Sequence, residues 1–128
     1  MKKILLTILA MLGLTACSNA QNHGFENMNV AEFADYIKND DVQLLDVRTP
    51  DEFNEGHISG AKNIDWYNEN FITDAVKELD KSKPVAIYCR SGKRSAAAAE
   101  KLTEKGYKVT NLLGGILAWD EAKMPIEK

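Results

Sequence analysis

The sequence has few of the residues that bind metal ions or crosslink small domains. Its 128 residues include two cysteines, two histidines and three prolines. The two histidines, His23 and His57, are far apart in the chain and belong to no cluster of ligating residues. A disulfide framework would need several pairs of cysteines and is therefore excluded. We expect neither a metal ion nor any other cofactor.

An excess of positive charge and a long apolar stretch are also missing. The 16 basic and 19 acidic residues give a net charge of −3, which argues against a nucleic-acid partner. The apolar run at 4–14 falls short of the roughly 20 residues that a membrane-spanning helix needs. The length suits one domain, and 45% hydrophobic residues are typical of a globular fold.

The first residues have the features of an export signal. Lys2 and Lys3 precede the apolar run, which has the length of the hydrophobic core of a secretory signal. The run ends in Leu14-Thr15-Ala16-Cys17, which resembles the lipobox of bacterial lipoproteins. The resemblance implies cleavage before Cys17 and attachment of lipid to its thiol. An ordinary signal peptide cleaved near a cysteine is the alternative.

These features predict three segments. Residues 1–16 would be a lipoprotein signal peptide, 17–28 a lipidated N-terminus and polar tether, and 29–128 the folded domain. The lipid on Cys17 would hold the domain at the periplasmic side of a bacterial membrane. Ser18, the residue after Cys17, resembles that of lipoproteins sent to the outer membrane in enterobacteria, so we expect the outer membrane rather than the inner one.

Cleavage would leave one unmodified thiol. Loss of Lys2 and Lys3 leaves 14 basic against 19 acidic residues, a net charge of −5. With Cys17 lipidated, Cys89 has no cysteine with which to pair inside the chain. An unpaired cysteine in an oxidising compartment indicates a reactive thiol with a function of its own.

Helical and strand patterns alternate along the expected domain. Asn29 with Glu32, and Thr49 with Glu52, have the spacing of helix-capping pairs. This alternation predicts an α/β fold with a central parallel sheet of about five strands flanked by helices. The patterns predict strands at 42–47, 61–64, 85–88 and 109–113, and helices at 30–37, 50–55, 71–79, 95–105 and 116–122.

A short loop that contains a cysteine and several cationic side chains follows the strand at 85–88. Cys89 lies at the carboxyl end of that strand, where parallel sheets bind their ligands. Arg90, Lys93 and Arg94 bring three cations into the loop, and the next helix adds the positive end of its dipole. Both features favour a thiolate. Gly92 suits a tight turn that needs a positive φ angle. A buried core cysteine is the alternative for Cys89 alone.

This loop and several motifs in a fixed order resemble the rhodanese homology domain, from about Asn29 to Pro125. The resemblance implies that Cys89 is the catalytic residue and carries a persulfide. It also implies that the amides and side chains of the following loop bind an anionic sulfur donor, which gives as substrate-binding residues Arg90, Ser91, Gly92, Lys93, Arg94 and Ser95. The matching motifs are 46–48, Glu52-Phe53, 56–61, Asn63-Ile64, the Cys89 loop and Gly114-Gly115 with Trp119.

Other polar and aromatic residues are interpreted more conservatively. Asp46, Arg48 and Glu52 could be catalytic, but an ion network that supports the loop is the favoured interpretation. His57 fits a hydrogen-bonded structural residue better than a general base. Trp66 and Trp119 are more typical of a core than of a ligand platform.

The resemblance implies transfer of sulfur from a donor such as thiosulfate to cyanide, a thiol or a protein. Tyrosine phosphatases and arsenate reductases share the fold, so function must be argued from the loop. Their signature places an arginine six residues after the cysteine, where this chain has Ser95, and Arg94 falls one residue short. Phosphatase chemistry is therefore disfavoured. A non-enzymatic persulfide carrier or docking module remains the main alternative.

Overall fold

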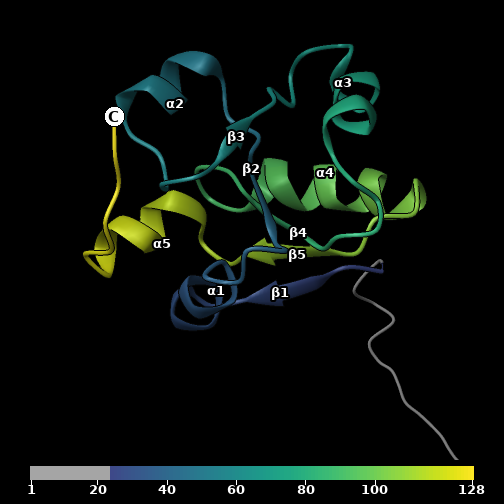
Figure 1. The fold of residues 1–128 in the computed structure, drawn as a ribbon. Coiled ribbons are helices and arrows are strands. Elements are labelled where there is room, and N and C mark those ends of the chain that lie inside the picture. The colour runs from purple at the N-terminus through teal and green to yellow at the C-terminus, as the bar shows by residue number, and fades with distance from the viewer. Residues whose placement is uncertain (1–23) are drawn as a thin grey trace, which may run out of the picture.

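A computed structural model describes residues 24–128 of the chain. Five parallel strands form one sheet in the order β1-β5-β4-β2-β3 (Figure 1). This architecture confirms the predicted α/β fold with a five-stranded parallel sheet. The strands are β1 Glu26–Met28, β2 Gln43–Asp46, β3 Lys62–Asn63, β4 Val85–Tyr88 and β5 Val109–Leu112.

Helices cover both faces of the sheet, as expected where parallel strands alternate with helices. Side chains of α3 and α4 pack against one face, and those of α1 and α5 pack against the other. The short helix α2 follows β2 and contributes no fully buried residue. The helices are α1 Val30–Tyr36, α2 Pro50–Glu55, α3 Phe71–Glu78, α4 Lys93–Glu104 and α5 Gly115–Glu121.

The central strand β4 is buried on both sides. Val85, Ile87 and the following Cys89 pack on the α3–α4 face, whereas Ala86 and Tyr88 pack on the α1–α5 face. This alternation follows from the two-residue period of a strand. The period therefore places the Cys89 side chain on the same face as α4, the helix that follows it.

Both predicted capping pairs are present. Asn29 and Glu32 exchange side-chain and backbone hydrogen bonds at the start of α1, and Thr49 and Glu52 do the same at the start of α2. Helix α4 begins at Lys93, two residues before the predicted start. The sequence pattern alone places Lys93 and Arg94 in the loop because both are polar, but neither residue disfavours a helix.

Strand β1 corrects the predicted tether at 17–28. Glu26, Asn27 and Met28 pair with β5, so the last three residues of that segment belong to the sheet. The strand escaped prediction because it is a short edge strand whose side chains are mostly exposed. No helix within residues 24–128 combines the length and hydropathy needed to cross a membrane. Cys17 and the signal peptide lie outside the described residues and stay predictions.

Candidate active site

The thiol of Cys89 lies at the carboxyl end of β4 and is 1% exposed. Its Sγ accepts a hydrogen bond from the backbone N–H of Gly92 at 3.1 Å. The Ser95 hydroxyl, from the first turn of α4, lies 3.4 Å from the same sulfur. Two hydrogen-bond donors thus reach one buried sulfur atom, an arrangement that stabilises negative charge on it.

The backbone of the loop is held by the start of α5. The N–H groups of Ile116 and Leu117 donate to the carbonyl oxygens of Cys89 and Arg90 at 2.9 and 3.1 Å. This close approach is possible because Gly115, the first residue of α5, has no side chain. Gly92 has a φ of 102°, so the predicted positive φ at this position is confirmed.

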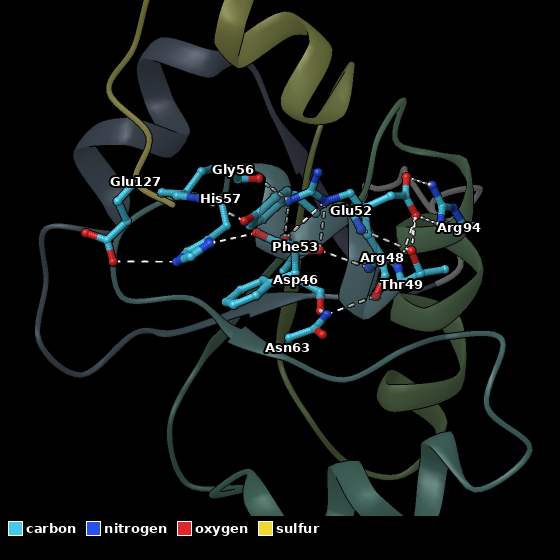
Figure 2. Close-up of polar contacts among 12 residues, drawn as sticks. Asp46, Arg48, Thr49, Glu52, Phe53, Gly56, His57, Asn63, Arg94 and Glu127 are labelled. Atoms are coloured by element: carbon cyan, nitrogen blue, oxygen red, sulfur yellow. Dashed lines mark hydrogen bonds and ion pairs between the residues drawn. The ribbon is translucent and has the colours of Figure 1, made fainter.

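The three loop cations have different surroundings. Arg90 and Lys93 are exposed, and within residues 24–128 neither has an acidic partner within 4 Å. Arg94 is half-buried and donates two hydrogen bonds to the Glu52 carboxylate at 2.8 and 2.9 Å (Figure 2). Its guanidinium also lies over the ring of Tyr67. Arg94 is therefore neutralised, whereas Arg90 and Lys93 keep their charge for an incoming anion.

The pairing with Arg94 changes the titration of Glu52. Hydrogen bonds from Arg94, and secondarily from Thr49, lower the pKa of Glu52 from its ordinary 4.5 to about 2, although partial burial acts in the opposite direction. The hydrogen bond with Glu52 in turn raises the pKa of Arg94. The bridge is therefore intact at neutral pH, and it joins α2 to the first turn of α4 across 42 residues of sequence.

This bridge predicts a loss of stability in acid. A carboxylate with a lowered pKa in the folded state stabilises the fold above its unfolded pKa, and that stability disappears as the pH falls from about 4.5 towards 2. After allowance for solvent screening, we expect wild type to lose about 1 kcal/mol more than Glu52→Gln between pH 5 and pH 2.5. Urea unfolding at the two pH values measures the difference. Glu55→Gln, an exposed change on the same helix, should behave as wild type, and equal losses in wild type and Glu52→Gln would contradict the prediction.

Asp46 and Arg48 form a buried pair beside the site (Figure 2). The two guanidinium nitrogens Nε and Nη2 donate to the Asp46 carboxylate, at distances of 2.6 to 3.1 Å, and Nη2 also donates to the Gly56 carbonyl at 2.7 Å. The side-chain amide of Asn63 in β3 donates to the backbone carbonyls of both residues. The pair thus joins β2, β3 and the end of α2, while Glu52 belongs to the separate bridge with Arg94.

The remaining predicted residues have structural contacts. The Nδ1 atom of His57 lies 2.9 Å from the Phe53 carbonyl, and the two rings stack at 3.8 Å (Figure 2). Trp119 is buried, and its indole N–H donates to the carbonyl of Pro125. Trp66 packs at the edge of the core. Within residues 24–128 no three His, Cys, Asp or Glu side chains are grouped as a metal site.

A cavity of about 280 Å³ lies next to the loop. Its wall includes the exposed cation of Arg90, the buried guanidinium of Arg48 and the apolar side chain of Leu117. Acidic side chains, among them Glu55 and Asp120, line other parts of the wall. The cavity therefore combines apolar surface with charges of both signs.

Sequence reasoning missed one polar residue close to the loop. Asn111 in β5 is 3% exposed, and its side chain contacts both Ser95 and Gly92. The signal was an asparagine inside the otherwise buried strand Val109–Leu112, where an amide needs partners. The sequence did not reveal which partners it has.

Comparison with known proteins agrees with this geometry. The model of the rhodanese-like domain family matches residues 29–122. A protein named sulfurtransferase from Allochromatium vinosum is 42% identical over 88 residues, which cover 68% of this chain and 79% of the relative. The thiosulfate sulfurtransferase GlpE of Shewanella oneidensis is 35% identical, and the match covers 77% of this chain and 95% of that protein.

A solved structure supports the same assignment. The crystal structure of a rhodanese-related protein from Thermoplasma volcanium superposes with a TM-score of 0.71 at 33% identity, covering 80% of this chain and 98% of the other. The match therefore covers most of both chains. The chain belongs to the family of rhodanese-like domains.

Proposed function

We propose that this domain is a sulfurtransferase that moves a sulfane sulfur from a donor such as thiosulfate to a thiophilic acceptor through a persulfide on Cys89. The observation that carries the proposal is the buried Cys89 Sγ with donors from Gly92 and Ser95. Relatives named sulfurtransferase, at 35 to 42% identity, support the same reaction class.

The proposed reaction has two nucleophilic steps. In the first, the Cys89 thiolate attacks the outer sulfur of thiosulfate and forms a new S–S bond. The S–S bond of thiosulfate breaks, and sulfite leaves with its electron pair. In the second step an acceptor such as cyanide attacks the outer sulfur of the persulfide, forms thiocyanate and returns the Cys89 thiolate. Atoms and electrons balance without any external oxidant or reductant.

The charges of the loop suit an anionic donor. Arg90 and Lys93 are exposed and have no acidic partner among the described residues, so both are available to a dianion such as thiosulfate. Arg94 is held by Glu52, so its contribution to donor binding is smaller than that of Arg90 or Lys93. We propose that Arg94 mainly braces the loop against α2.

The same pairing argues against phosphatase or arsenate reductase chemistry. Such enzymes need a free guanidinium that grips a tetrahedral anion with two hydrogen bonds. Here the sixth residue after Cys89 is Ser95, and Arg94 already gives two hydrogen bonds to Glu52. The loop therefore lacks a free arginine at the required position.

A mass measurement tests the proposal. Incubation of the reduced protein with thiosulfate should add one sulfur atom, about 32 Da, to the peptide that contains Cys89, because a stabilised thiolate captures the outer sulfur. Cyanide should then remove the added mass. Prior alkylation of Cys89 with iodoacetamide is the control and should prevent the gain. A folded, reduced protein that gains no mass would contradict thiosulfate sulfurtransfer.

A further inference from the structure

The amide of Asn111 is a buried polar group that the proposed reaction does not yet use. Asn111 lies opposite Ile87 in the pairing of β5 with β4, on the sheet face that α4 covers. Only 3% of the residue is exposed. A buried amide without partners costs free energy, so its partners show how this part of the core is organised.

The hydrogen-bond partners of Asn111 lie in the Cys89 loop, in the first turn of α4 and in the neighbouring strand β1. Its Oδ1 accepts a hydrogen bond of 2.6 Å from the Ser95 hydroxyl. Its Nδ2 donates to Asn27 Oδ1 in β1 at 3.1 Å and lies 3.5 Å from the Gly92 carbonyl oxygen. Ser95 and Gly92 are the two residues whose donors reach the Cys89 sulfur. One amide thus contacts both residues that stabilise the nucleophile.

The hydroxyl of Ser95 has one proton and two possible acceptors. While Cys89 is an uncharged thiol, the short contact to Asn111 Oδ1 takes this proton, and the hydroxyl oxygen can accept from the thiol. A negatively charged sulfur is the stronger acceptor, so the hydroxyl can turn to it through a single bond rotation.

Without Asn111 the hydroxyl has a competing partner. A serine in the first turn of a helix can donate to the carbonyl oxygen three residues earlier, which for Ser95 is that of Gly92, the N-cap of α4. Such a rotation would remove one of the two donors from the sulfur. The contact with Asn111 disfavours this rotation because it holds the hydroxyl between β5 and Cys89.

We propose that Asn111 is a positioning residue for the nucleophile, which acts by holding the Ser95 hydroxyl beside Cys89. The amide of Asn27 fixes the orientation of the Asn111 side chain from the edge strand. The inference rests on the proposed function only in taking Cys89 as the nucleophile, and it needs no particular sulfur donor. It gives strand β1 a role in the site that its distant place in the sequence does not suggest.

A double-mutant cycle on the full chain tests the proposal. The rate of Cys89 alkylation by iodoacetamide at neutral pH is measured by peptide mass in wild type, Ser95→Ala, Asn111→Leu and the double variant. We expect each single change to slow alkylation by about tenfold, because one hydrogen bond to a charged sulfur is lost. The double variant should be no slower than the singles, because Asn111 acts through Ser95.

The control is Thr110→Val, a buried change of similar shape on the same strand whose side chain faces the opposite side of the sheet. It should alkylate within about twofold of wild type, in keeping with the absence of any contact between Thr110 and Ser95 or Cys89 among the hydrogen bonds of residues 24–128. A folded Asn111→Leu with the wild-type rate, or a double variant slowed by the product of the two single effects, would overturn the proposal.

A second measurement needs no substitution and applies even where Asn111→Leu does not fold. The side-chain amide signals of Asn111 in the ¹⁵N spectrum of wild type should shift when Cys89 is alkylated, whereas those of Asn29 at the start of α1 should not. Unchanged Asn111 signals would overturn the proposal. The alkylation rates of the four proteins can follow the expected pattern while the wild type takes no sulfur from thiosulfate. That result would reject the proposed function and leave this inference standing.

Discussion

Replacement of Cys89 by serine is expected to lower thiocyanate formation from thiosulfate and cyanide by at least about 10³-fold, with the fold retained. Serine is close to cysteine in size and can accept the hydrogen bond from Gly92, so the buried loop should keep its shape. Its hydroxyl is a far weaker nucleophile at neutral pH than a thiolate, and the reaction needs a sulfur that can form and release an S–S bond. Steady-state assay and thermal unfolding of both proteins measure the two effects.

A relocated thiol provides the matched control. The double variant with Cys89→Ser and Ser91→Cys carries a thiol in the same loop, but position 91 is exposed. We expect no recovery of turnover, because the donors from Gly92 and Ser95 converge on the sulfur at position 89. Recovery by Ser91→Cys, or more than about a tenth of wild-type turnover in folded Cys89→Ser, would contradict catalysis by Cys89.

The same variant separates the enzyme from its alternatives. A persulfide carrier that receives its sulfur from another protein would not be loaded by thiosulfate, so its wild type would form no thiocyanate from thiosulfate and cyanide. A pure docking module would bind its partner equally well with or without the thiol. Turnover that disappears with the Cys89 sulfur therefore distinguishes a sulfurtransferase from both.

Much of the fold could be predicted because its signals are local. The apolar runs before Asp46 and Cys89 indicate buried parallel strands, and Thr49 with Glu52 has the spacing of a capping box. The position of Cys89 at the end of a parallel strand follows from the same reasoning. Each of these inferences depends on residues within a few positions of one another.

The parts that could not be predicted depend on contacts between distant segments. The bridge from Glu52 to Arg94 spans 42 residues, and Asn111 meets Asn27 across 84. The resemblance to the rhodanese homology domain implies that Arg94 is a donor-binding residue, and in the structure its side chain pairs with the Glu52 carboxylate. The contacts of Asn111 likewise depend on the parallel pairing of β5 with the edge strand β1.

The start of α5 links the predicted glycine motif to the chemistry of the loop. Its N–H groups bind the carbonyl oxygens of Cys89 and Arg90, which fixes the peptide planes on the carboxyl side of the nucleophile. Gly92 then directs its own N–H to the sulfur. The pair Gly114-Gly115 is therefore part of the support for the site as well as a turn between β5 and α5.

Replacement of Gly115 by alanine should strongly lower the free energy of unfolding. Gly115 has a φ of 58°, and a Cβ atom at this position would lie 2.4 Å from the carbonyl oxygen of Arg90 and 2.6 Å from that of Cys89. These atoms belong to the backbone and cannot rotate away, so the loop itself must move. We expect a loss of about 3 to 5 kcal/mol in the free energy of unfolding, from left-handed strain and overpacking combined. Urea unfolding measures it.

Gly60→Ala is a control that separates the cost of backbone strain from the cost of a steric clash. Gly60 also has a positive φ, 87°, but no atom lies within 4 Å of where its Cβ would be. It should therefore cost only the conformational strain, about 1 to 2 kcal/mol, and leave Cys89 alkylation unchanged. Gly115→Ala should in addition slow that alkylation by about tenfold or more, because the displaced loop would lose the hydrogen bond from the Gly92 N–H to the sulfur. Equal destabilisation by the two variants, with equal alkylation rates, would show that the α5 terminus does not hold the nucleophile in place.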